Sequence, residues 1–219
     1  VLSLPLQLDS SNTQALEKAM RMYNGKAMIN SVNGKQSSMS EVFPLVQKYG
    51  GVVVCLCLDE SGIPETAQGR IDIAKKIIKT AESYGIDKKD LVVDALVMTI
   101  STNKDNAKET LKAVDYIRHE LGVGTVLGVS NISFGLPKRE AINTAFFTLA
   151  LKAGLSAGII NPLSESMMNA YYSYNALEGF DDNCTQYIES VTASANTAAT
   201  AGVTDLKMAI IKGMKEDAG

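Results

Sequence analysis

The sequence predicts an α/β fold built as a (β/α)8 barrel, on three observations. Six short apolar stretches with strand character alternate with longer amphipathic stretches of helical period. The strands are apolar on both faces, which is typical of parallel strands covered by helices. Their spacing of roughly 20 to 40 residues fits a barrel better than an open doubly wound sheet, although alternation alone does not close a barrel.

The individual elements follow from local signals. The predicted strands cover residues 4–9, 26–30, 52–59, 91–97, 125–130 and 157–161. The clearest helical stretches cover residues 10–23, 64–85, 103–122 and 137–154. The first of these opens on a Ser or Asn that can cap a helix, and in the second Pro64 marks the start and Gly85 the stop.

The strand count predicts an incomplete barrel. A barrel of this type takes about 250 residues and eight strands, whereas this chain has 219 residues and shows six strand patterns. We therefore expect the first two βα units to lie before Val1, in a longer protein. Residues 1–162 are predicted to form the six-stranded barrel domain. Residues 163–219, rich in small residues and without a clear strand, are predicted to form the last barrel helix and a helical connector.

Composition restricts the classes of partner and compartment. Lys and Arg number 21 against 24 Asp and Glu, and no basic cluster longer than a pair occurs, which argues against nucleic acid and against an anionic membrane surface. No signal peptide or apolar run of membrane length is present. Three cysteines without a framework spacing indicate free thiols in a reducing compartment, so a cytoplasmic location is expected.

Polar residues follow the predicted strands, at the edge where barrel enzymes place their active sites. In chain order these residues are Asp9, Ser10, Asn30, Ser31, Asn33, Asp59, Asp94, Asn131, Ser133 and Asn161. The set contains carboxylates, amides and hydroxyls but no His, Lys or Cys. This composition argues against a Schiff-base lysine and against a zinc site, and no metal is expected on this chain.

The remaining reactive residues have simpler interpretations. His119 lies in a helical stretch beside Arg118, as expected of a solvated helix face. Cys55 and Cys57 share one face of a strand and are expected in the core.

Asp and Asn at strand ends suit one class of ligand. A heterocycle with an aminopyrimidine edge offers neighbouring N–H donors to a carboxylate, and an amide supplies one donor and one acceptor. Any one of these residues could instead cap a helix or make a turn, as Asp9 before "SSN" and Asp59 before "ESGIP" could. The recurrence at successive strand ends carries the interpretation.

Several segments together resemble a known family. They are "PLQLDSSN", "INSVNG", "LDESGIP", "VVDALV" and "TVLGVSNISFGLPKREAINTAFFTLALKAGLSAGIINP". These segments closely resemble the methyltetrahydrofolate-binding, or pterin-binding, barrel of corrinoid-dependent methyltransferases, which includes the folate module of cobalamin-dependent methionine synthase. The resemblance covers residues 4 to 162, and "LGVSN" is its most specific part.

The resemblance implies an activity and a set of site residues. The family transfers the N5-methyl group of 5-methyltetrahydrofolate to cob(I)alamin carried by a corrinoid-binding domain or corrinoid protein. By position, Asp9 and Asp94 match the carboxylates that hold the pterin, and Asn30 matches an amide beside them. Asn131 matches the catalytic amide that hydrogen-bonds N5, and Arg139 matches an arginine near the folate.

Further implications concern the neighbours of this set. Ser133 and Asn161 complete the expected substrate-binding residues. Relatives carry a polar residue at the position of Phe134, which leaves that contact open. Relatives are often dimeric, so a homodimer is one arrangement that the resemblance implies.

The chemistry of the reaction explains why an amide can suffice. The corrinoid is the nucleophile, and the tertiary amine leaves well only if N5 gains positive character. A preoriented hydrogen bond that strengthens as N5 becomes protonated stabilises the transition state over the ground state. The Asn131 amide can donate or accept, so it fits this role.

Three alternatives stay open at this point. A dihydropteroate synthase shares the fold and pterin pocket but should carry basic anion-binding groups, of which "SNISFGLPKRE" offers only Lys138 and Arg139. A non-catalytic folate-binding or corrinoid-docking module would bind without turnover. An unrelated sugar-phosphate barrel should carry a glycine-rich phosphate site after its last two strands, and the glycines of "LKAGLSAGIINP" precede or lie within the strand.

Overall fold

The computed structural model describes residues 4–200 and the side chains of residues 4–192. The chain divides into two compact units, residues 1–161 and 162–219. The first unit holds all the strands of the described part of the chain, and the second holds helices.

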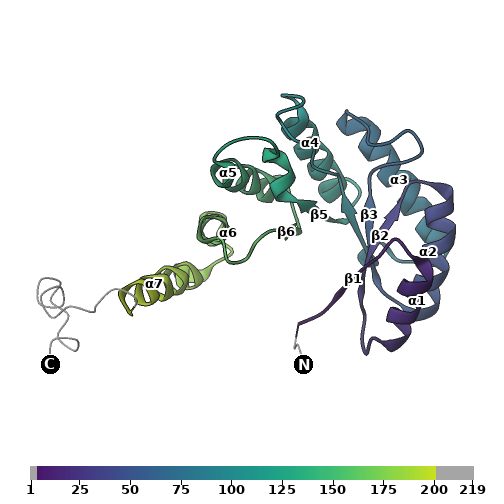
Figure 1. The fold of residues 1–219 in the computed structure, drawn as a ribbon, viewed down its shortest axis with the longest axis horizontal. Helices are drawn as coiled ribbons and strands as arrows, with labels where there is room; N and C mark the ends of the chain where they lie inside the picture. Colours follow the sequence, from purple (N-terminus) through teal and green to yellow (C-terminus); the bar gives the residue numbers. More distant parts are fainter. Residues whose placement is uncertain (1–3, 201–219) are drawn as a thin grey trace, which may run out of the picture. The chain divides into compact units, whose positions relative to one another are not determined.

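The first unit is built on one parallel six-stranded sheet, shown in Figure 1. Its strands lie in chain order and are β1 (Gln7–Asp9), β2 (Met28–Asn33), β3 (Val52–Leu56), β4 (Leu91–Asp94), β5 (Gly124–Gly128) and β6 (Ala157–Ile159). Within the described residues β1 and β6 are the two end strands and do not pair with each other. The unit is therefore a parallel half-barrel, and an eight-stranded barrel would need two more strands.

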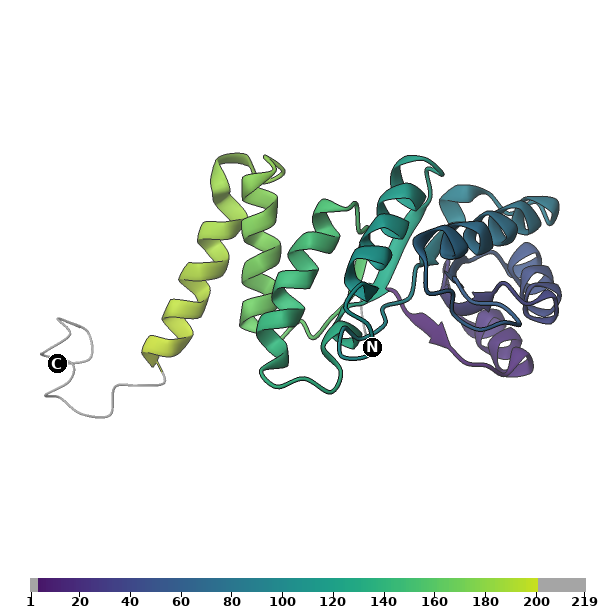
Figure 2. The same ribbon diagram turned by 90° about the horizontal axis from the view of Figure 1, so that it is seen from above.

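Helices follow the strands in alternation, as the periodicity predicts. They are α1 (Thr13–Met22), α2 (Gln36–Tyr49), α3 (Ala67–Ser83), α4 (Asn106–His119) and α5 (Arg139–Lys152). Figures 1 and 2 show these helices ranged along the sheet. Because every connection from strand to strand passes through a helix, all six carboxyl ends lie at the same edge of the sheet.

The capping residues decide where the helices begin. Asn12 caps α1, and its side chain accepts a hydrogen bond from the N–H of Ala15. Helix α3 begins at Ala67 rather than near Pro64, because Thr66 is its cap and accepts from the N–H of Gly69 at 3.2 Å. Gly85, with φ of 75°, follows the last turn of α3, as expected of a helix stop.

Helix α2 is the element that the sequence pattern did not single out. Pro44 lies inside it, and an internal proline ordinarily argues against a helix because it lacks an N–H and crowds the preceding turn. Burial outweighs this local cost: Met39 and Phe43 have no exposed surface, and Val42 and Val46 are also buried. The apolar face of α2 therefore stabilises the helix through packing.

The core lies between the sheet and these helices. Ile29, Val32, Val53, Val93 and Leu127 come from four neighbouring strands and have no exposed surface. Each such side chain contributes about 1.5–3 kcal/mol by leaving water. Cys55 and Cys57 are fully buried free thiols, which confirms their interpretation as core residues.

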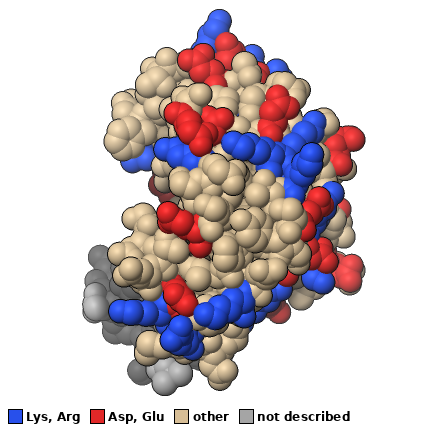
Figure 3. All heavy atoms as spheres, turned by 90° about the vertical axis from the view of Figure 1, so that its right-hand side faces the viewer, with Lys and Arg blue, Asp and Glu red and all other residues tan. Residues whose placement is uncertain are grey.

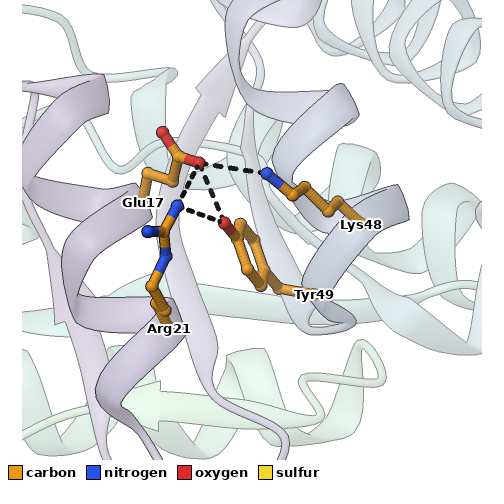
Figure 4. A network of polar contacts seen from close by, with 4 residues as sticks. All are labelled: Glu17, Arg21, Lys48 and Tyr49. Carbon is orange, nitrogen blue, oxygen red and sulfur yellow. Dashed lines mark hydrogen bonds and ion pairs between the residues drawn. The ribbon is translucent and has the colours of Figure 1, made fainter.

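At the far ends of α1 and α2, four side chains join the two helices, as Figure 4 shows. Glu17 accepts hydrogen bonds from the Tyr49 hydroxyl at 2.9 Å, from Lys48 at 3.3 Å and from Arg21 at 3.2 Å. These contacts, with the Tyr49 hydrogen bond first, hold the pKa of Glu17 below its usual value. Arg21 and Lys48 are exposed, Glu17 and Tyr49 are half-buried, and together they join the two helices away from the carboxyl ends of the strands.

The second unit contains α6 (Glu165–Leu177) and α7 (Thr185–Thr200). The carboxylate of Asp181, a buried residue, accepts from the N–H groups of Gln186 at 3.0 Å and Tyr187 at 2.9 Å. This carboxylate satisfies two otherwise unpaired donors at the start of α7.

The surface mixes both signs of charge. Figure 3 shows acidic and basic side chains interspersed over one face, without a large area of either sign. Within the described residues, no helix is both long enough and apolar enough to cross a membrane.

Candidate functional site

The first pair of site residues lies at the ends of β1 and β2. Asp9 and Asn30 are register partners in the sheet, and the Asn30 Nδ2 donates to Asp9 Oδ2 at 3.2 Å. Asp9 is exposed and Asn30 is half-buried. The bond uses one carboxylate oxygen, so the exposed carboxylate keeps capacity to accept hydrogen bonds from a ligand.

A cleft of about 360 Å³ opens beside this pair. Its lining is mostly polar and consists of Asp9, Ser10, Ser11, Thr13, Leu16, Asn30, Ser31, Asn33, Lys35, Ser37, Ser38, Glu41 and Val42. The sequence-predicted rim residues of the first two strands are thus brought together in one concave site.

The predicted end of the second strand differs from the observed one. Strand β2 continues to Asn33 across a register shift between Asn30 and Val32, after which Val32 pairs with Cys55. Asn30 therefore lies just before a bulge rather than at the strand end. A bulge changes the direction of the side chains beside it, and the sequence pattern carries no signal for it.

Asp94 is the last residue of β4 and is buried, with 8% of its surface exposed. Its Oδ1 accepts a hydrogen bond from the N–H of Leu96 at 2.8 Å. Burial raises the pKa of the Asp94 carboxyl to about 6, against the opposing effects of the Leu96 N–H and the Arg70 charge. At neutral pH the group is mainly a carboxylate whose charge has little water around it.

The strand ends abruptly after Asp94 because of the backbone at Leu96. Leu96 has φ of 62°, in the left-handed region that leucine rarely adopts. The sequence predicts a strand as far as Val97, but this conformation cannot continue a β-strand. Such a conformation costs about 1–3 kcal/mol and persists where surrounding contacts enforce it.

Asn131 lies in a 3-10 helix, η2 (Val129–Ser133), directly after β5. Its side chain is exposed and has no hydrogen-bond partner in the described part of the chain. A Cβ added at Gly128 would lie 3.1 Å from Asn131 Nδ2, so the glycine gives the amide room against the end of β5. The amide is thus held close to the strand end with its polar atoms available.

Backbone contacts fix the position of η2. The carbonyl oxygen of Ile132 accepts from the N–H of Ile100 at 3.0 Å and from the Thr99 hydroxyl at 3.2 Å. These bonds join the segment after β4 to the segment after β5. They link the loop that follows Asp94 to the turn that carries Asn131.

Ser133 and Arg139 form a connected pair. Ser133 is fully buried, and its hydroxyl donates to Asn143 Oδ1 at 2.7 Å. Arg139 Nε donates to the same hydroxyl at 3.0 Å, and Arg139 Nη2 donates to the carbonyl of Ser130 at 2.8 Å. The exposed arginine is thereby tied to the turn around Asn131, while Ser133 serves this network.

Phe134 extends this network to the surface. Phe134 is 66% exposed, and the centre of its ring lies 5.6 Å from the Arg139 guanidinium carbon, within cation–π range. Its carbonyl oxygen accepts hydrogen bonds from Thr99 at 2.7 Å and Ser101 at 3.0 Å. Asn161, the last predicted site residue, follows β6 and is exposed.

The structure adds residues that sequence reasoning missed. Arg70 is completely buried in α3. The sequence could have indicated this, because Arg70 lies at helical spacing from Ile73, Ile77 and Ala81, on the apolar face of that helix. Gly128 gave no separate signal, because a glycine in "LGVSN" reads equally well as the start of a turn. His119 is exposed on α4, as predicted, and its Nδ1 lies 3.0 Å from Asp115 Oδ1.

The chemistry of the site is that of hydrogen bonding. Within the described residues, no group of three His, Cys, Asp or Glu side chains is arranged to hold a metal ion. The strand ends instead offer an exposed carboxylate, a buried carboxylate and an unpaired amide. Such a set can accept the N–H donors of a flat heterocycle and direct one amide to a reacting atom.

A parallel half-barrel with polar groups at its strand ends defines a class of α/β barrel proteins that bind a ligand at the carboxyl edge of the sheet. The family model described as pterin binding enzyme matches residues 1–161, and the chain belongs to this family. The match covers the whole first unit.

The curated relatives give a finer placement. Over 181 residues the chain is 34% identical to methionine synthase of Mycobacterium tuberculosis, covering 76% of this chain and 15% of that protein. It is 29% identical over 188 residues to methylcorrinoid:tetrahydrofolate methyltransferase of Eubacterium limosum, covering 84% of this chain and 69% of that protein. The resemblance to the pterin-binding domain of corrinoid methyltransferases is thus confirmed, and the chain spans a small part of methionine synthase.

A solved structure agrees on the fold. The crystal structure of FolP, a dihydropteroate synthase from Clostridium difficile in the presence of pteroic acid, matches with a TM-score of 0.63 at 21% identity. The match covers 80% of this chain and 68% of that chain. At this identity the likeness shows the fold alone.

Proposed function

We propose that this chain binds 5-methyltetrahydrofolate and acts in the transfer of its N5-methyl group to cob(I)alamin carried by a partner domain or protein. The observation that carries the proposal is the Asn131 amide, exposed and unpaired within the described residues, in a turn joined to the loop after Asp94. The family membership and the methyltransferase relatives support it.

Each site residue has a proposed part. The carboxylates of Asp9 and Asp94 accept N–H donors of the pterin edge, and Asn30 orients Asp9 through the 3.2 Å hydrogen bond. Arg139 and Asn161 contact the outer part of the folate, and Ser133 holds Arg139 in place. Asn131 hydrogen-bonds N5 and strengthens that bond as N5 gains positive character.

The corrinoid supplies the nucleophile that accepts the methyl group. This chain's part is to bind the folate, to orient N5 and to stabilise its developing charge. Residues 163–219 are proposed to contain the last barrel helix and a connector toward a corrinoid-binding module; residues 201–219 of this stretch lie outside the described part of the chain. A homodimer is a further arrangement open to test by light scattering.

Two measurements on the 219-residue chain test the proposal. An isotherm for 5-methyltetrahydrofolate measures binding, and absorbance spectroscopy measures methyl transfer to free cob(I)alamin. Binding with transfer supports the proposal. Binding without transfer would favour a docking module, and condensation of a pterin pyrophosphate with an aromatic amine would favour a dihydropteroate synthase.

Asp9→Asn is expected to weaken folate binding by about 1.5–3 kcal/mol, the range for a hydrogen bond to a charged group. The rate at saturating folate should change less, because the pterin edge is bound alike in the ground and transition states. A binding isotherm and a saturated transfer rate measure both quantities.

Asp115→Asn is a matched control for this substitution, since Asp115 is exposed on α4 and bonds only His119 among the described side chains. It should leave binding and rate unchanged. Normal folate affinity in Asp9→Asn, combined with a lost rate, would assign Asp9 to proton transfer instead.

A further inference from the structure

Arg70 is a charged residue in the middle of the core. None of its surface is exposed. Its Nε donates to the carbonyl of Pro64 at 2.9 Å, and its Nη1 donates to the carbonyl of Leu96 at 3.0 Å and to the Thr110 hydroxyl at 2.7 Å. Nη2 is buried and has no hydrogen-bond partner among the described residues.

Such a residue is costly for folding. Burying a guanidinium with one NH2 group unpaired loses hydration that its other hydrogen bonds do not replace, and burial lowers the pKa of Arg70. Arginine nevertheless keeps its charge in proteins. An apolar side chain at position 70, on the same helix face as Ile73 and Ile77, would avoid this cost. Packing alone therefore does not explain why the residue is charged.

The hydrogen bonds of Arg70 lead directly to Asp94. Arg70 and Thr110 both bind the carbonyl oxygen of Leu96, at 3.0 and 3.3 Å. The N–H of Leu96, on the other side of the same residue, donates to Asp94 Oδ1 at 2.8 Å. Leu96 has the uncommon φ of 62°, and these contacts at both of its ends hold it there.

The titratable groups around the Asp94 carboxyl come from three other segments of the chain. The Arg70 charge in α3 lowers the pKa of Asp94, whereas burial raises it. Cys57, directly after β3, has its pKa raised well above the usual value, mainly by burial and then by Asp94, so it is neutral at physiological pH. Glu109 in α4 accepts from the N–H of Ala67 at 2.7 Å and pairs with Lys112 at 2.8 Å.

We propose that Arg70 is a positioning residue for Asp94, holding the Leu96 backbone that orients the carboxylate toward the pterin N–H groups. The positive charge of Arg70 also favours the carboxylate form of Asp94. Arg70 itself touches no substrate. The inference rests on the proposed function in taking a pterin as the ligand, while the link from Arg70 to Asp94 stands on the structure of the chain itself.

The test is a titration of the Asp94 side-chain carboxyl by ¹³C NMR in the ligand-free 219-residue chain. Arg70→Met removes the charge and the bonds to Leu96, and is expected to raise the Asp94 midpoint by about one pH unit. Arg70→Lys keeps the charge without the planar fork, so its midpoint should stay nearer to that of the wild type. An unchanged midpoint in Arg70→Met overturns the proposal.

Thr110→Val is a second variant that tests the proposal even if Arg70→Met does not fold. It removes the Thr110 hydroxyl, which is the second donor to the Leu96 carbonyl beside Arg70, and keeps the Arg70 charge. In both Thr110→Val and Arg70→Lys, the pH-dependent shift of the Leu96 amide that reports its bond to Asp94 should shrink. An amide response equal to the wild type in both variants overturns the proposal. Arg118→Met, at an exposed arginine of α4, is the control for net charge and should change neither signal.

Binding of 5-methyltetrahydrofolate as a function of pH provides the second readout. A midpoint raised by about one unit weakens binding by about fivefold at pH 6 and by less than about 1.5-fold at pH 8. A loss of equal size at every pH would indicate a merely structural role and overturn the proposal. If the wild-type chain does not bind the folate, the proposed function fails, while the NMR titration still decides the role of Arg70.

Discussion

Asn131→Ala is expected to slow methyl transfer from bound 5-methyltetrahydrofolate by about 10²- to 10³-fold. Loss of one preorganised hydrogen-bond donor at a developing charge costs this much in other enzymes. The amide has no competing hydrogen bond in the described part of the chain, so it is available to N5 without first giving up another partner. Folate affinity should fall less than the rate, because the bond to N5 strengthens in the transition state.

Stopped-flow transfer to cob(I)alamin at saturating folate, beside a direct binding isotherm, measures the two effects separately. Asn24→Ala is a matched control, since Asn24 is an exposed amide before the start of β2, at the opposite edge of the sheet. A normal saturated rate with weaker binding in Asn131→Ala would make Asn131 a binding contact only.

Asp94→Asn is expected to weaken folate binding by about 1.5–3 kcal/mol and, at pH 7, to stabilise the ligand-free chain. The folded pKa of Asp94, about 6, lies above the ordinary value of 3.8. A carboxyl with a raised folded pKa stabilises the fold at low pH, and this contribution is lost as the pH rises from about 4 through 6. The shift corresponds to about 1–3 kcal/mol.

Urea unfolding of wild type and Asp94→Asn between pH 4 and pH 8 tests this prediction. The free energy of unfolding of the variant should exceed that of the wild type at pH 7, and the difference should disappear toward pH 4. Asp9→Asn is the control, since Asp9 is exposed. A variant less stable than the wild type at pH 7 would show that the carboxylate, once formed, stabilises the fold. The expected result means that the Asp94 carboxylate lowers the stability of the fold while it contributes to folate binding, a trade-off often found at functional sites.

The periodicity was sufficient for the order of the six strands and for helices α1, α3, α4 and α5, because it reflects local physics. An apolar run such as Val52–Leu56 is removed from water on both faces only in a sheet covered by helices, and each covering helix needs one apolar face toward that sheet. Boundaries were less predictable: β4 stops at Asp94 because Leu96 takes a positive φ, and α2 forms despite Pro44 because its apolar face is buried. Both outcomes depend on contacts with residues distant in sequence.

The sequence by itself determined the parallel α/β class and the polar strand ends, including Asp9, Asp94 and Asn131. The alternation of strands and helices places these ends on one edge whatever the details of packing. Only the tertiary structure decided that Asp94 is buried with a raised pKa, that Asn131 is unpaired among the described residues, and that Arg70 lies behind the carboxylate. Burial and charge proximity arise between segments far apart in the chain, so no local pattern encodes them.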